Sequence, residues 1–167
     1  MIEALRALVA EPSFPSLHVM VVHFPIAFIA FAPLLDLACL VFRDRVWLDR
    51  AAAAMYLVGT LGAGAAYLLG EEAAAAVQSM TPATESVLAD HEAQAVITLV
   101  VLATATLIRL IVTWLGRDDR RIKIGIFRLL ALPAVIAALA MLALTADLGG
   151  QLVYRHGVGV TVESSER

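Results

Sequence analysis

The sequence predicts an all-α fold, a four-helix transmembrane bundle whose helices extend beyond the bilayer on the periplasmic side. Three observations predict this class. The 167-residue chain is 61% hydrophobic and 16% charged, which is more apolar than a soluble domain. Four segments each carry about 20 mostly apolar residues, the length that crosses a bilayer. The basic residues gather in the connections on one side of these segments.

The four expected spans are separated by connections rich in charged or small residues. The spans run over residues 17–42, 51–70, 93–115 and 127–148. Pro25 and Pro33 lie inside the first span and are expected to kink it, because proline cannot donate the helical N–H bond. One membrane domain, residues 16–157, is therefore expected between an N-terminal periplasmic segment, 1–15, and a C-terminal tail, 158–167.

The second and third helices are expected to form a long hairpin that stands clear of the bilayer. The strong helix formers in EEAAAAVQSM continue the second helix beyond its apolar span. Thr81 suits an N-cap and Pro82 the first helical position, so the turn is expected near residues 79–81. The fourth helix is expected to reach His156, with Gly157 as the residue that ends it.

The distribution of charge indicates the orientation of the bundle. The two basic connections hold Arg43, Arg45, Arg50, Arg117, Arg120, Arg121, Lys123 and Arg128, and the acids on the opposite side include Glu71, Glu72, Glu85, Asp90 and Glu92. The positive-inside rule places the basic connections in the cytoplasm, so both termini are expected in the periplasm of a bacterial inner membrane. The net charge of −3, without a basic cluster carrying aromatics, excludes nucleic acid and leaves the lipid bilayer as the first partner.

Two charged residues lie inside the expected spans. Arg109 is close to the cytoplasmic end of the third span and is expected to extend its side chain to the interface there. Asp36 lies near the cytoplasmic end of the first span, where it can pair with Arg109 or Arg45. We interpret Asp36 as structural.

All four histidines fall on the expected periplasmic side, which favours a ligand site there. His18 and His23 open the first helix, His91 lies on the outer part of the third, and His156 ends the fourth. Haem b is held by imidazoles that project inward from facing helices of a bundle. His18 and His23 differ by about 140° around a helix, so they cannot easily ligate one iron together.

Four residues near the end of the chain complete the predicted cofactor site. Gly149 and Gly150 would let a flat ring approach the backbone of the fourth helix. Arg155 can pair with a haem propionate. Tyr154 belongs to a polar stripe on the same helix that can hydrogen-bond a ligating imidazole.

Two other interpretations remain open at this stage. Zinc or copper can be held by His23, His91 and His156 together with a carboxylate. The chain can also be an accessory subunit without a cofactor, because small residues are the ordinary packing device of membrane helices. A single cysteine, Cys39, excludes a CxxC pair and a CxxCH haem attachment, and the sequence lacks HExxH, GxSxG, P-loop and GxGxxG motifs.

Three motifs, VHFPIAF, a DH pair opening the third span and GGQLVYRHGVGV, resemble the bacterial membrane proteins of the domain-of-unknown-function family 2231. The resemblance covers residues 17–160. It implies a four-helix membrane domain that is sometimes joined to or near cytochrome or Rieske-type redox domains, which favours electron transfer. The pattern of the family maps onto His23, His91, Gly149, Gly150, Tyr154 and His156. His18 matches less closely, because many members have His-Pro where this chain has His18-Val19.

These observations together predict a membrane protein that binds haem b and transfers electrons in or beside a respiratory or photosynthetic chain. We expect an electron carrier or an accessory subunit rather than an enzyme, with redox proteins or a second copy of the chain as partners. His23 and His91 are the expected axial pair, followed by His156 and then His18.

Overall fold

The computed structural model describes residues 17–42, 45–77, 80–115 and 123–160, without the side chains of residues 115–132. The described residues form helices and short connections, with no strand among them. The helices are α2 (Leu17–Val21), α3 (His23–Val41), α4 (Val46–Ala75), α5 (Pro82–Leu115) and α6 (Lys123–Tyr154). With α2 and α3 counted as one broken helix, this is the all-α four-helix bundle that the sequence predicts.

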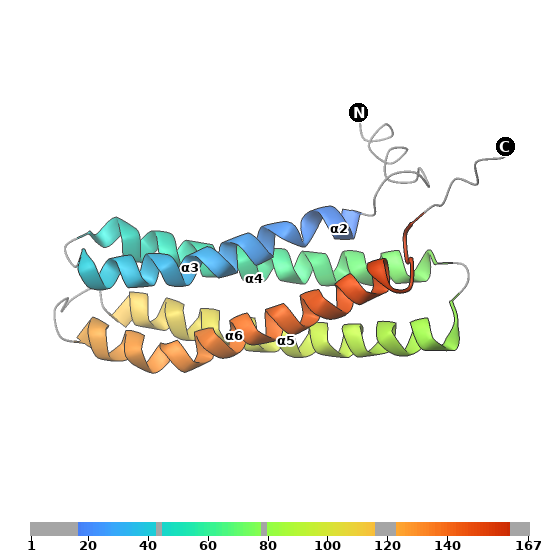
Figure 1. The fold of residues 1–167 in the computed structure, drawn as a ribbon. Coiled ribbons are helices and arrows are strands. Elements are labelled where there is room, and N and C mark those ends of the chain that lie inside the picture. Colours follow the sequence, from blue (N-terminus) through green and yellow to red (C-terminus); the bar gives the residue numbers. More distant parts are fainter. Residues whose placement is uncertain (1–16, 43–44, 78–79, 116–122, 161–167) are drawn as a thin grey trace, which may run out of the picture.

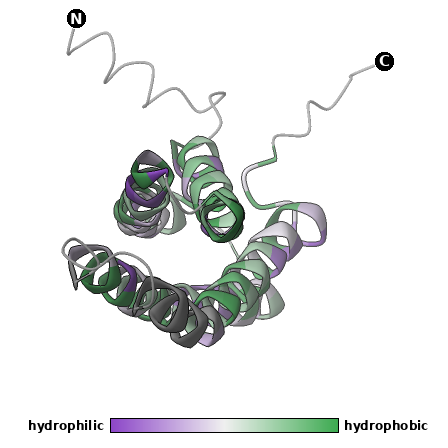
Figure 2. Cartoon of the chain, turned by 90° about the vertical axis from the view of Figure 1, so that its left-hand side faces the viewer, coloured by the Kyte–Doolittle hydropathy of each residue, from purple (hydrophilic) through white to green (hydrophobic). Residues whose placement is uncertain are grey.

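The helices form two antiparallel hairpins that lie side by side (Figure 1). One hairpin consists of α2 and α3 packed on α4, and the other consists of α5 packed on α6. The hairpins meet mainly where α4 packs on α5, whereas α3 and α6 make few contacts with each other. Hydrophobic residues cover most of the helix surfaces (Figure 2), and four helices are long and apolar enough to cross a membrane.

The first span is interrupted at Val22, between α2 and α3. Pro25 explains the break, because it has no N–H to donate to the carbonyl of Val21, four residues before it. The chain nevertheless continues in one general direction, since the N–H of Val22 still bonds to the carbonyl of His18 at 3.0 Å. The kink that the sequence predicts is therefore confirmed at Pro25, while Pro33 lies inside α3 without ending it.

Two residues predicted to mark helix ends, Thr81 before α5 and Gly157 after α6, have the expected local conformations. The Thr81 side chain caps α5 by accepting the N–H of Thr84 at 3.2 Å, with Pro82 as the first helical residue. Of the predicted turn, residue 79 lies outside the described part of the chain. α6 ends at Tyr154, two residues before the expected His156, and after the turn that follows it Gly157 takes a positive φ of 67°, a conformation that glycine adopts without strain.

The core lies at the middle of the bundle, where the helices approach closely. Its buried members are Ile29, Ala32, Tyr56, Leu102, Ala105, Val135 and Ala138. Gly59 permits the closest approach: a Cβ atom at this position would lie 2.7 Å from Cδ1 of Ile29. Small residues therefore hold α3 against α4, as is usual between membrane helices.

Arg109 does not extend to the interface, and that expectation is wrong. Its side chain is 1% exposed and lies between three helices. Nη2 donates to Oδ1 of Asp36 at 2.7 Å and to Oδ1 of Asp49 at 2.9 Å, while Nη1 donates to Thr113. The pairing with Asp36 is confirmed. Asp49 was missed because α4 begins at Val46, before its apolar segment, so this carboxylate faces the bundle from the first turn of the helix.

Replacing Arg109 with methionine should destabilise the bundle by about 3–5 kcal/mol, because two carboxylates would lose their common cation in a poorly solvated site. Thermal unfolding in detergent, followed by circular dichroism, measures this loss. Arg155→Met is the matched control, since Arg155 is exposed and should cost little. Equal stability of both variants would show that the cluster does not hold the helices together.

Candidate functional site

Two histidines from different hairpins lie next to each other near one end of the bundle. His18 belongs to α2 and His91 to α5, and both side chains are half-buried. Their ring centres are 6.5 Å apart, and the ring planes meet at 87°. The structure therefore brings His91 beside His18 rather than beside His23, the partner expected from the sequence.

Each of the two imidazoles is anchored through Nδ1 to a backbone carbonyl. Nδ1 of His18 lies 2.7 Å from the carbonyl oxygen of Ala66 on α4, and Nδ1 of His91 lies 3.1 Å from that of Thr145 on α6. A carbonyl oxygen can only accept, so Nδ1 carries the proton in both rings. Nε2 is then the nitrogen that each neutral ring offers to a ligand, which is the usual arrangement around metal-binding histidines.

Two glycines make room for these rings. A Cβ atom at Gly70 would lie 3.1 Å from Cε1 and Nδ1 of His18, and one at Gly149 would lie 3.2 Å from Cε1 of His91. Both distances are shorter than ordinary van der Waals contact. The absence of these two side chains therefore lets each imidazole lie directly against the backbone of the neighbouring helix.

A hydroxyl network supports the carbonyl that holds His91. The hydroxyl oxygens of Thr145 and Thr98 lie 2.7 Å apart, so one hydroxyl donates to the other. The Thr145 hydroxyl also lies 3.0 Å from the carbonyl oxygen of Met141, which is its other acceptor. Thr98 is buried and also bonds to the carbonyl of Gln94 at 2.8 Å. This network ties α5 to α6 directly below the imidazole and fixes its backbone partner.

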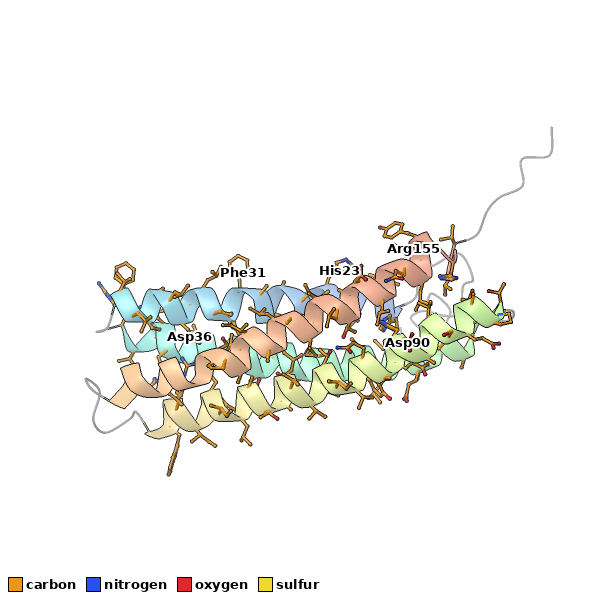
Figure 3. All side chains as sticks on the ribbon, turned by 60° about the horizontal axis from the view of Figure 1, so that its bottom comes forward. His23, Phe31, Asp36, Asp90 and Arg155 are labelled. Atoms are coloured by element: carbon orange, nitrogen blue, oxygen red, sulfur yellow. The ribbon has the colours of Figure 1, made fainter. Side chains whose placement is uncertain are left out.

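His23 and His156 lie elsewhere. His23 is exposed, its Nδ1 bonds to the carbonyl of Val19 at 2.7 Å, and it lies on α3 as labelled in Figure 3. Nδ1 of His156 lies 3.1 Å from Oγ1 of Thr84, which is buried in the first turn of α5. His156 thus ties the end of α6 to the start of α5.

The other predicted residues near the chain's end lie on the outer surface of α6. The Tyr154 side chain is 90% exposed, and a Cβ atom at Gly150 would only touch the ring of Tyr154 at 4.0 Å. Arg155 is exposed (Figure 3) and lies 3.5 Å from the amide oxygen of Gln151, which in turn bonds to Asp147 at 2.7 Å. This polar stripe therefore pairs within itself and does not bond to His91.

The described residues contain no group of three or more His, Cys, Asp or Glu side chains placed to hold a metal ion. His23, His91 and His156 are accordingly not gathered into one site there. Sequence reasoning missed Ala66 and Thr145 because they act through their carbonyls, which no side-chain pattern reveals. Sequence reasoning also missed Gly70. Gly70 follows Ala66 at the same spacing as Gly149 follows Thr145.

The fold defines a multi-pass membrane protein, with a pair of anchored imidazoles near one end of its bundle. A family model described as "Predicted membrane protein (DUF2231)" matches residues 15–162. The chain therefore belongs to this family, as the motifs indicated. No curated protein and no solved structure matches the chain.

Replacing His156 with alanine should loosen the end of the bundle by about 1 kcal/mol, because the Thr84 hydroxyl loses a hydrogen bond that links two helices. Hydrogen exchange at the first amides of α5 measures this effect as faster exchange. His23→Ala serves as the control, since its ring bonds only within its own turn. Unchanged exchange in His156→Ala would show that this contact contributes nothing to the helix end.

Proposed function

We propose that this membrane protein binds haem b between His18 and His91 and transfers electrons. The observation that carries the proposal is the arrangement of the two rings: they come from different hairpins, lie 6.5 Å apart and keep Nε2 for a ligand. A carbonyl acceptor at Nδ1 that leaves Nε2 available is the usual arrangement of histidines that bind a metal.

The separation of the rings favours one kind of coordination. Two imidazoles that bind one metal from opposite sides, each at about 2 Å, hold their ring centres about 6 Å apart. Two ligands of a tetrahedral ion lie closer together. Ring centres 6.5 Å apart are close to this separation, so Nε2 of His18 and Nε2 of His91 would be the atoms that hold the haem.

The two histidines are the residues that would hold the haem, and two features of their surroundings support this assignment. Gly70 and Gly149 remove the side chains that would otherwise push the imidazoles away from their carbonyls. Few contacts join α3 and α6, so the bundle is less tightly closed on that side. Arg155 directly follows α6, is exposed and lies near Gln151 (Figure 3), so a propionate would reach it only at the outer edge of the bundle.

Haem supplies one-electron chemistry when bound, and the protein supplies ligands, orientation and a low dielectric. Carbonyl acceptors at Nδ1 increase the basicity of both imidazoles and fix their orientation. The half-buried position of His18 and His91 limits the access of water to Nε2. These features suit an electron carrier, because two anchored imidazoles hold a cofactor in a fixed orientation.

Replacing either His18 or His91 with alanine should abolish six-coordinate haem binding, because each removes one axial ligand. The purified parent is expected to show a Soret band with α and β bands on reduction, and His23→Ala should keep them. A colourless parent that retains copper or zinc would favour the metal-binding alternative. A colourless parent without metal would favour the accessory subunit, and both results would refute haem binding.

The orientation that the charges predict places this site at the periplasmic face. In a Cys39→Ala background, Ser86→Cys at the start of α5 should react in intact cells with a thiol reagent that cannot cross the membrane. Phe42→Cys, at the opposite end of the bundle, should not react until the cells are opened. The reverse labelling pattern would move the site to the cytoplasmic face.

A further inference from the structure

The two hairpins match each other position by position, which the sequence alone does not make obvious. Arg109 follows Asp36 by 73 residues, and His91 follows His18 by the same interval. These four residues form two of the pairs that meet between the hairpins, one pair toward each end of the bundle. Each pair thus joins the same position of α2–α3 and of α5.

Burial follows the same register along these helices. The buried residues Pro25, Ile29, Ala32 and Cys39 of α3 correspond to the buried residues Thr98, Leu102, Ala105 and Val112 of α5. Any amphipathic helix buries positions at this spacing, but here the offset between the two helices is the same one that relates His18 to His91 and Asp36 to Arg109. The first helix of each hairpin therefore turns corresponding residues toward the interior of the bundle.

The second helices match as well. Three residues of α4 correspond to three residues of α6 at one constant separation along the chain. The corresponding pairs are Gly59 and Ala138, Ala66 and Thr145, and Gly70 and Gly149. Each carbonyl that accepts an imidazole lies one helical turn before the glycine that makes room for the ring. A histidine, a carbonyl and a glycine thus form the same unit in both hairpins.

We infer that the two hairpins are a repeated unit related by a pseudo-two-fold axis, and that Gly70 and Gly149 are equivalent positioning residues of two half-sites that share one ligand. The identity of that ligand as haem rests on the proposed function. The equivalence of the half-sites rests only on the geometry described above. A ligand shared in this way is bound equally by both hairpins, one ligand for each chain.

The two halves depart from symmetry in one respect. In a perfect repeat, α6 would pack on α3 as α4 packs on α5, yet α3 and α6 make few contacts. The connection between α4 and α5 holds that pair of helices together, whereas α3 and α6 are not consecutive in the chain (Figure 1). The shared site is therefore closed on the α4–α5 side and less restricted on the α3–α6 side.

The two half-sites are tested by matched glycine substitutions in the full chain. Gly70→Ala and Gly149→Ala should each weaken haem affinity by about 10–100-fold, because each displaces one imidazole from its carbonyl. Both should shift the Soret and α bands to a similar extent. Gly64→Ala and Gly150→Ala are the controls, since a Cβ atom meets nothing within 4 Å at Gly64 and only the Tyr154 ring at Gly150. All four changes raise helix propensity alike.

The apo protein gives a readout that does not depend on haem. Imidazole ¹⁵N spectra of the parent should show His18 and His91 both protonated at Nδ1, and each glycine variant should alter only the histidine on its own side. Loss of affinity and of the imidazole signal in Gly149→Ala alone would overturn the equivalence of the half-sites. A parent that binds no haem but shows the paired imidazole signals would refute the proposed function and leave the repeat supported.

Discussion

The buried guanidinium of Arg109 is the constraint on which the rest of the structure depends. It is shared by Asp36 of α3 and Asp49 of α4, so one cation joins both helices of the first hairpin to the second. Apolar packing between membrane helices tolerates sliding, because lipid and side chains are equally apolar. An ion pair at 2.7 Å does not, and it sets the axial register of the hairpins. Since His18 and His91 are equally far along their helices from this pair, the same register brings the imidazoles together.

Two polar clusters lie in the interior of the bundle, at different levels along its length. The charged cluster lies near one end and the imidazole pair near the other, with the apolar core of Ile29, Leu102 and Val135 between them. Polar groups in the interior are costly unless they are paired, and both layers meet this condition through hydrogen bonds between helices. The apolar layer keeps the two apart. Each polar cluster therefore determines which helices lie side by side at its own level of the bundle.

The sequence predicts much of this fold, because spans, caps and the helix-ending glycine depend on local patterns. Thr81 and Gly157 are recognisable from neighbouring residues alone. The partner of His91 is not, because it depends on the break at Pro25 and on the rotation of α2 against α4, which is set by tertiary packing. Asp49 was missed for a related reason: hydropathy locates the apolar part of a helix but not the polar turn with which it begins.

The interruption at Val22 places His18 on a separate five-residue helix rather than on the long membrane helix that follows. Such a short helix gains little stability from its own hydrogen bonds and depends on its packing against α4. Its placement is therefore set by α4, through the carbonyl of Ala66, whereas the position of α3 is fixed by the charged cluster. The two histidines of the pair are thereby oriented in different ways: His91 by the long helix on which it lies, and His18 by a neighbouring helix that accepts its Nδ1 proton and leaves room for its ring at Gly70.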